Sequence, residues 1–294
     1  MDPVACGLAR QQGARTNPRD QEPERGKMPK TFPTRALLLA LSAVLLAACA
    51  ATSPGPSPEV RQALAPTGKL RAALYPGTPT SILRDGPGGA PRGVGYELGK
   101  EMAKRLGVPY EPVVYPKNDD VLKAISNGDA DVAFTNASPA RQKIMNFTPP
   151  FMFVELGYLV GPGSPLTSVA DVDRPGLRVG VTERSSSDAA LSRDLKNASV
   201  VRSTTLKQGI DMLAAHQIDA YATNKATLSE MADTIPGSRI LDGRWGVEHF
   251  AIAMPKGREA GMEFARKFAA DAKAEGLVQA AAERAGLRGT VQAP

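Results

Sequence analysis

One stretch of the sequence, residues 120–151, constrains the fold most strongly, because a helical pattern passes directly into a strand pattern there. Val121 and Ile125 recur at helical spacing, and Gly128 ends the helix. The next apolar run, Asp131 to Phe134, has the length of a short buried strand. A helix that leads into a buried strand through a short acidic turn is typical of α/β proteins with mainly parallel sheets.

The same order of patterns occurs twice in the chain. Residues 121–133 contain a helix, the turn Gly-Asp-Ala-Asp and a strand, and residues 206–221 repeat this order around His-Gln-Ile-Asp. The chain has 294 residues, of which 42% are hydrophobic, and this is enough material for more than one compact unit. We therefore expect two similar α/β lobes.

A polar turn follows the first buried strand and precedes a new helix. Ser138 is suited to cap that helix, and Pro139 is suited to its first position. The hydroxyl of Thr135, the side chain of Asn136 and the guanidinium of Arg141 then converge near free backbone N–H groups. These groups predict a site that holds a carboxylate.

The motifs in this region resemble those of a known family. The Gly-Asp-Ala-Asp turn, the strand, the Ser-Pro-Ala-Arg turn at 138–141 and the segment Asn146–Phe151 follow one another, and a second motif occupies 95–107. This order resembles the periplasmic solute-binding proteins of ABC importers, specifically the amino-acid-binding type (bacterial extracellular solute-binding protein family 3). The resemblance covers roughly Lys69 to Leu287.

The resemblance implies a type II periplasmic binding fold, which is α/β and two-lobed. Each lobe is then a mixed, mostly parallel sheet flanked by helices, and two strands form the hinge. We expect lobe 1 to comprise residues 67–158 plus 249–294 and lobe 2 to comprise residues 161–246, with a hinge at Gly161-Pro162-Gly163. The ligand would lie between the lobes.

The resemblance also directs attention to individual residues. Arg141 matches the arginine that holds the ligand's α-carboxylate in this family. The loop 182–188 matches the family's Gln-Gly-Ser/Thr-Thr loop, so Ser185 or Ser186 is expected to donate to the same carboxylate. Capping of the following helix explains a serine there equally well, and one serine can serve each purpose.

Two family carboxylates are missing from this sequence. Asn224 occupies the position of the aspartate that binds the ligand's ammonium, and Tyr75 falls near the position of a first-strand aspartate. Thr78, in the turn after Tyr75, completes the predicted ligand-binding set. A buried ammonium needs an opposite charge or a full set of acceptors. The sequence therefore leaves two alternatives: a carboxylate ligand without an amine, or an amino acid held by neutral acceptors.

The N-terminal region has the pattern of an exported lipoprotein. We interpret residues 1–27 as a mis-assigned extension that contains Cys6, and residues 28–48 as a signal peptide whose apolar run is too short to span a membrane comfortably. Cys49 ends a lipobox and would be acylated, and residues 49–66 form a Ser/Pro-rich tether. The mature chain then has no other cysteine for a disulfide or a metal site.

Charge and composition limit the remaining partners. The formal net charge is +6, and basic and acidic residues are interspersed, so no nucleic-acid-binding stripe is expected. The two histidines, His216 and His249, stand apart, so we expect no metal and no cofactor. We expect a monomer that is attached to a membrane only by its lipid, in the periplasm or cell envelope.

These observations predict a lipid-anchored solute-binding protein rather than an enzyme. It would capture a small carboxylate-bearing solute, an amino acid or a related organic anion, by hinged closure and present it to ABC permease subunits. One alternative is an exported enzyme on the same scaffold, such as a cyclohexadienyl dehydratase, with Glu183 as the acid in the cleft. Another is an orphan sensory receptor.

Overall fold

The computed structural model describes residues 55–86 and 88–291 of the chain. The chain separates into two compact units, residues 1–53 and 54–294, and every described residue belongs to the second. The predicted extension, signal peptide and acylated Cys49 lie outside the described residues. Among the helices that the structure describes, none combines the length and apolar character needed to cross a bilayer.

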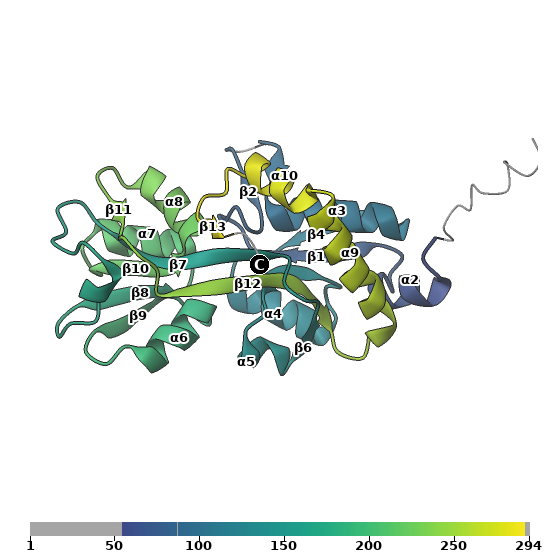
Figure 1. Cartoon of the computed structure of the whole chain (residues 1–294), viewed down its shortest axis with the longest axis horizontal. Coiled ribbons are helices and arrows are strands. Elements are labelled where there is room, and N and C mark those ends of the chain that lie inside the picture. The colour runs from purple at the N-terminus through teal and green to yellow at the C-terminus, as the bar shows by residue number, and fades with distance from the viewer. Residues whose placement is uncertain (1–54, 87, 292–294) are drawn as a thin grey trace, which may run out of the picture. The chain divides into compact units, whose positions relative to one another are not determined.

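The second unit contains two lobes, which lie at opposite ends of a pair of long strands (Figure 1). In lobe 1, β1 pairs in parallel with β4, and helices α3 and α4 connect the strands around them. The chain returns to this lobe after the second crossing and adds α9 and α10. The elements of lobe 1 are α2 (Pro58–Leu64), β1 (Leu70–Leu74), β2 (Leu83–Arg84), β3 (Pro91–Arg92), α3 (Val94–Leu106), β4 (Tyr110–Val114), α4 (Asn118–Asn127), β5 (Ala133–Asn136), α5 (Pro139–Gln142), β6 (Met145–Phe147), η3 (Glu259–Gly261), α9 (Met262–Ala274) and α10 (Leu277–Arg284).

Lobe 2 repeats the α/β alternation that the sequence predicts. Strand β8 pairs in parallel with both β9 and β10, and helices α6 and α7 connect them. Its elements are η2 (Val169–Asp171), β8 (Arg178–Thr182), α6 (Ser186–Asp194), β9 (Ser199–Ser203), α7 (Leu206–Ala214), β10 (Ala220–Asn224), α8 (Lys225–Thr234) and β11 (Arg239–Ile240).

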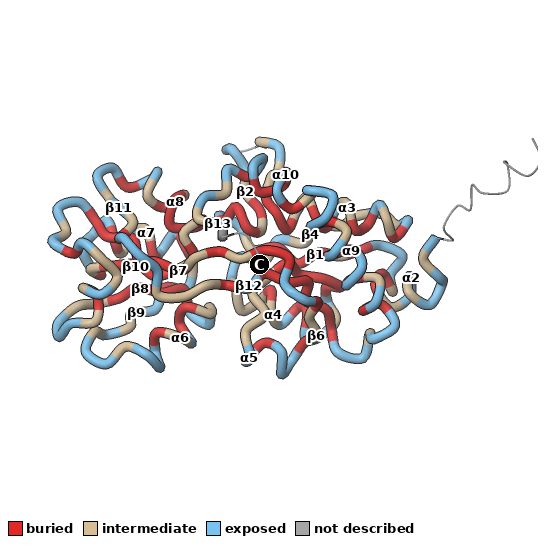
Figure 2. The backbone as a smooth tube through the Cα atoms, in the orientation of Figure 1, coloured by how far each residue is buried: buried red, intermediate tan, exposed pale blue. Residues whose placement is uncertain are grey.

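Strands β7 (Met152–Val160) and β12 (Gly246–Pro255) connect the lobes as an antiparallel pair. They join both lobes into one nine-stranded sheet in the order β5-β12-β7-β10-β8-β9, and β13 (Thr290–Val291) adds to β7. This arrangement confirms the predicted two-lobed fold. Buried residues concentrate along these two strands and on the inner faces of the surrounding helices (Figure 2).

The predicted hinge position is wrong. The segment 156–160 already pairs with β10 and therefore belongs to the sheet of lobe 2. The crossing lies before it, and Gly161-Pro162-Gly163 only ends β7 at the far side of that lobe. A glycine and proline cluster shows where a strand stops, whereas β7 continues as one strand through the crossing.

The predicted tether is also too long. Residues 58–64 form helix α2, which Ser57 caps by accepting a hydrogen bond from the backbone N–H of Val60 at 3.3 Å. Leu64 is fully buried and lies so close to Gly261 that a Cβ there would approach its Cγ to 2.7 Å. Serine and proline are frequent in linkers, but they are also frequent at the first positions of helices. This segment therefore has the composition of a linker and yet forms a helix that packs on lobe 1.

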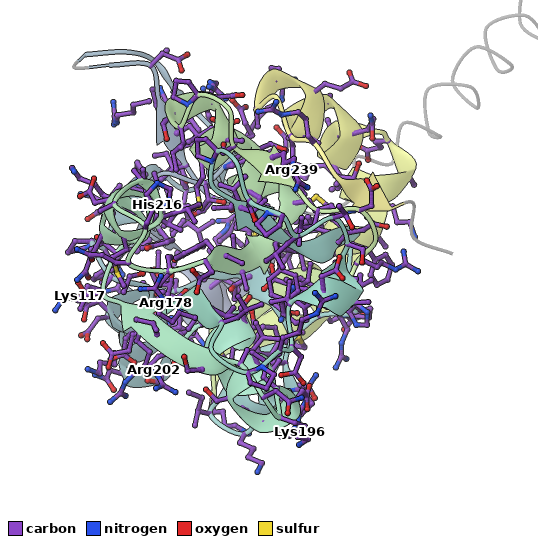
Figure 3. The ribbon with its side chains drawn as sticks, turned by 90° about the vertical axis from the view of Figure 1, so that its left-hand side faces the viewer. Lys117, Arg178, Lys196, Arg202, His216 and Arg239 are labelled. Carbon is purple, nitrogen blue, oxygen red and sulfur yellow. The ribbon has the colours of Figure 1, made fainter. Side chains whose placement is uncertain are left out.

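Each lobe contains the same arginine clamp on the turn before its central strand. In lobe 1, Arg71 Nη2 donates to Asp131 Oδ1 at 2.7 Å and to the carbonyl of Gly128 at 2.8 Å. In lobe 2, Arg178 Nη2 donates to Asp219 Oδ1 at 2.9 Å and to the carbonyl of His216 at 2.8 Å. Figure 3 labels Arg178 and His216. The sequence repeat therefore corresponds to a structural repeat.

Candidate functional site

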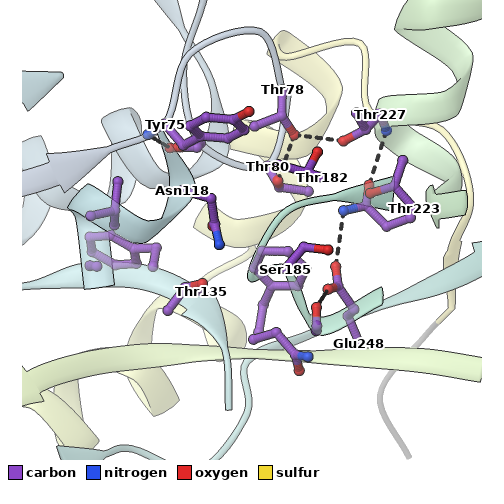
Figure 4. A pocket seen from close by; sticks show the side chains of 18 of the residues that line it. Tyr75, Thr78, Thr80, Asn118, Thr135, Thr182, Ser185, Thr223, Thr227 and Glu248 are labelled. Atoms are coloured by element: carbon purple, nitrogen blue, oxygen red, sulfur yellow. Dashed lines mark hydrogen bonds between the residues drawn. The ribbon is translucent and has the colours of Figure 1, made fainter. Parts of the chain in front are cut away.

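A cavity of about 80 Å³ lies between the lobes, and both lobes and the β12 crossing contribute to its walls (Figure 4). Most of the residues that line it carry a hydroxyl or an amide group. The residues that line it are Ala73, Tyr75, Thr78, Thr80, Ser81, Asn118, Val121, Ala133, Phe134, Thr135, Asn136, Arg141, Thr182, Ser185, Ser186, Ser187, Leu206, Thr223, Asn224, Thr227, Glu248 and Phe250.

Arg141 is the buried cation of this cavity. Ser138 caps α5 by accepting from the backbone N–H of Arg141, and the side chain of Arg141 is only 7% exposed. Its Nη1 donates to Thr135 Oγ1 at 2.7 Å and to the carbonyl of Asn136 at 3.3 Å. Burial lowers the pKa of Arg141, and the charge of Glu248 opposes that shift. Within the described part of the chain, no carboxylate lies within ion-pair distance of Arg141, although burying a lone cation is costly.

Glu248 is the buried anion of the same cavity, and the sequence analysis missed it. It is 6% exposed, and its carboxylate accepts hydrogen bonds from Asn224 Nδ2 at 2.9 Å and from the hydroxyl of Ser186. One sequence signal was available. Glu248 lies two residues before Phe250 in β12, and side chains two residues apart in a strand lie on the same face. The apolar Phe250 therefore indicates that Glu248 also points inward.

Asn224 holds this carboxylate in place. It caps α8 because its Oδ1 accepts from the backbone N–H of Thr227 at 3.0 Å, and its Nδ2 donates to Glu248. Asn224 therefore stands where the family has an aspartate, and its side-chain carbonyl already accepts the hydrogen bond that caps α8. The negative charge that is missing at residue 224 is supplied to the cavity by Glu248 of β12.

The two serines of the loop 182–188 have different roles: one caps the following helix, and the other is directed to a polar group of the cavity. Ser185 caps α6 by accepting from the backbone N–H of Asp188 at 3.0 Å, while Ser186 donates to Glu248. Both residues line the cavity.

Three contacts between the lobes enclose the cavity. The backbone N–H of Leu206 donates to Tyr75 Oη at 3.3 Å, and the hydroxyls of Thr78 and Thr227 are 2.9 Å apart. Burial raises the pKa of the Tyr75 phenol. On another side, Asn118 Nδ2 donates to the carbonyl of Arg184 at 3.2 Å. The structure thus shows a closed arrangement of the two lobes.

Eight of the nine predicted ligand-binding residues line this one cavity, and Ser138 does not. Ser138 caps α5 and positions Arg141 through the backbone. Glu183, which the enzyme alternative required, is exposed and is not among the lining residues. Within the described residues, no group of three or more histidine, cysteine, aspartate or glutamate side chains is arranged to hold a metal ion.

The fold and the cavity between its lobes define a class, the two-lobed solute-binding proteins. The chain belongs to one family of that class, the bacterial extracellular solute-binding proteins, family 3, whose family model matches residues 70–286. The family resemblance stated from the sequence is therefore confirmed.

Two relatives cover most of the folded part. The glutamine-binding protein GlnH of an ABC transporter from Bacillus subtilis is 24% identical over 79% of this chain and 88% of its own length. A substrate-binding protein of an amino acid ABC transporter from Streptococcus pneumoniae, solved with L-arginine bound, is 25% identical. That comparison covers 76% of this chain and 97% of the solved one, with a TM-score of 0.68.

A third relative is an enzyme. A membrane-bound lytic murein transglycosylase F from Vibrio cholerae is 32% identical over 118 residues, which is 40% of this chain. This chain spans only 21% of the length of that enzyme.

Proposed function

We propose that this protein captures a free α-amino acid outside the bacterial cytoplasmic membrane and delivers it to the permease of an ABC importer. The observation that carries the proposal is Arg141, a buried guanidinium that faces the cavity without an acidic partner among the described residues. A ligand carboxylate would supply the missing anion through charge-assisted hydrogen bonds. Thr135 would add a donor, because its oxygen accepts from Arg141 while its hydroxyl hydrogen is unused in that bond.

Glu248 supports a ligand that also carries an amine. The cavity has a cation on the lobe 1 side and an anion on the crossing strand, which matches the charge separation of a zwitterion. Asn224 and Ser186 orient the Glu248 carboxylate, so it is ready to accept from an ammonium. Of the two alternatives left by the sequence, this favours the amino acid, held by a charged acceptor instead of neutral ones.

The relatives support the transport role. GlnH and the Streptococcus pneumoniae protein are both named as parts of ABC transporters. We further propose a monomer attached to the membrane by acylation of Cys49, as the lipobox predicts. Replacing Cys49 by serine should release the protein from the membrane fraction, and membrane retention of that variant would contradict the anchor.

Isothermal titration with a panel of free amino acids tests the proposal. We expect Arg141→Ala to weaken binding at least ~30-fold, since truncating one partner of a buried charge pair costs about 2–5 kcal/mol. Arg266→Ala is the matched control, because Arg266 is an exposed arginine of lobe 1. If Arg141→Ala binds with wild-type affinity, the assignment of Arg141 as the carboxylate-binding residue is wrong.

Paired ligands separate the amino acid from the amine-free acid. Serine and glycerate, or alanine and lactate, differ only by an amine and a hydroxyl at the α-carbon. We expect wild type to prefer the amine, and Glu248→Gln to lose that preference. Equal binding of both members of a pair by wild type would instead indicate an organic-acid receptor. Prephenate in the same panel, followed for product, tests the dehydratase alternative, which stays a prediction, as does the sensory one.

A further inference from the structure

We infer that the cavity selects α-amino acids with short side chains, and that the buried hydroxyl cluster of Thr78, Thr80 and Thr227 is the wall that sets this limit. The inference rests on the proposed function and names the class of ligand. It concerns the part of the cavity that the carboxylate and ammonium groups of the ligand leave unused.

The cluster forms a continuous wall across the two lobes. Thr78 Oγ1 lies 2.8 Å from Thr80 Oγ1 and 2.9 Å from Thr227 Oγ1, and all three residues are buried. Thr78 and Thr80 come from the loop after β1, whereas Thr227 is in the first turn of α8. In Figure 4 the cluster lies across the site from Thr135, and Asn224 connects Thr227 of the cluster with Glu248. A side chain that extends away from the Arg141 and Thr135 end therefore meets this wall.

The size of the cavity sets the limit. A space of about 80 Å³ holds roughly five to eight water-sized spheres, at about 10–15 Å³ for each. The carboxylate, the α-carbon and the amine of an amino acid use most of that space. What remains admits the side chain of alanine, serine or cysteine, but not that of glutamine, lysine or arginine.

Two contacts between the lobes border the cavity in other directions. Tyr75 meets the backbone of Leu206 beside the cluster, and Asn118 meets the backbone of Arg184 on another side. Arg184 has φ of 57°, an uncommon value for a residue other than glycine, and this conformation belongs to the loop that makes the contact. A long side chain directed toward either contact would have to break it in order to leave the cavity.

The cluster also favours a polar end on the ligand. Each threonine hydroxyl has a single hydrogen to donate, and the two hydrogen bonds within the cluster use only part of these donors. One donor therefore remains for an acceptor, which a serine hydroxyl or a cysteine sulfur supplies. We expect serine or cysteine to bind more tightly than valine.

Titration calorimetry of the full chain with alanine, serine, cysteine, valine, asparagine, glutamine, lysine and arginine tests the inference. We expect the best of the short amino acids to bind at least ~100-fold more tightly than any of the long ones, since even one excess methylene in a fitted pocket changes affinity by roughly 10-fold or more. Thr227→Ala removes a hydroxyl and a methyl group from the wall. It should raise the affinity for asparagine relative to serine by about 10-fold.

Thr234→Ala is the matched control, because Thr234 is in the same helix and does not line the cavity. This variant should keep the wild-type ratio. If arginine or lysine binds wild type as tightly as serine, and Arg141→Ala abolishes that binding, the size limit is wrong while the proposed function stands. If short amino acids bind best but Thr227→Ala leaves the ratio unchanged, the wall is assigned to the wrong residues. Absence of binding by any amino acid overturns both proposals.

Discussion

The two arginine clamps have nearly the same hydrogen bonds but very different surroundings. Arg71 and Arg178 each donate from the backbone and from the side chain to one aspartate, Asp131 in lobe 1 and Asp219 in lobe 2. The Asp131 side chain is 0% exposed, whereas that of Asp219 is 30% exposed. The same local sequence pattern is therefore a buried element in one lobe and a surface element in the other.

A second arginine accounts for part of this difference. Arg258 follows the return crossing and places Nη1 2.6 Å from Asp131 Oδ1, so two guanidinium groups share one buried carboxylate. Nothing equivalent is bonded to Asp219, whose side-chain partner is Arg178 alone among the described residues. The chain that comes back into lobe 1 thus covers the clamp there, and lobe 2 has no such returning segment.

The largest expected effect is the loss of the buried clamp. Asp131→Asn should destabilise the protein by about 3–5 kcal/mol, because it removes the charge that compensates two largely buried arginines. Urea unfolding followed by circular dichroism measures this loss. A cost below that of the corresponding change in lobe 2 would contradict the contrast between the two clamps.

The exposed clamp should contribute less. Asp219→Asn is expected to cost about 1–2 kcal/mol, since the hydrogen bonds to a charged group are lost at a site that water partly screens. The same unfolding experiment gives the comparison directly, and the m-value should not change. Equal losses for both variants would mean that burial does not determine the strength of the clamp.

The contribution of Asp219 should also depend on pH. Hydrogen bonds from the Arg178 guanidinium lower the pKa of Asp219 in the folded state, so the folded state binds fewer protons at this group than the unfolded state does. The stability it provides is complete above the ordinary aspartate pKa and is lost as the pH falls through the lowered one. Wild type and Asp219→Asn should therefore converge in stability in acid and differ most near neutral pH. A gap that is constant from neutral pH down into acid would contradict this assignment.

The smallest effect concerns the residue whose carbonyl each clamp binds. That residue has φ of 79° at Gly128 and 54° at His216, so only lobe 2 places a side chain in the left-handed region. His216→Gly should stabilise the protein by roughly 0.5–1 kcal/mol by removing this strain. Gly128→Ala should act in the opposite direction, and thermal unfolding of the two variants tests both. A destabilised His216→Gly would show that the histidine makes compensating contacts.

Local patterns in the sequence determined much of this protein. Helical spacing, the stop at Gly128 and the serine caps led to the α/β elements, and the repeated acidic turn led to two lobes. The turn at Ser138 led to Arg141, because a cap and the following helix are encoded within a few residues. These features depend on neighbours along the chain, so the sequence shows them directly.

The tertiary structure alone decided where the anion of the cavity comes from. Glu248 meets Ser186 and Asn224, which precede it by 62 and 24 residues, only because β12 leaves lobe 2 beside β7. The same holds for the burial of Asp131 by Arg258 and for the packing of α2. The local sequence of one segment does not indicate which distant segment it will contact. These contacts form only when the whole chain folds and brings distant strands into register.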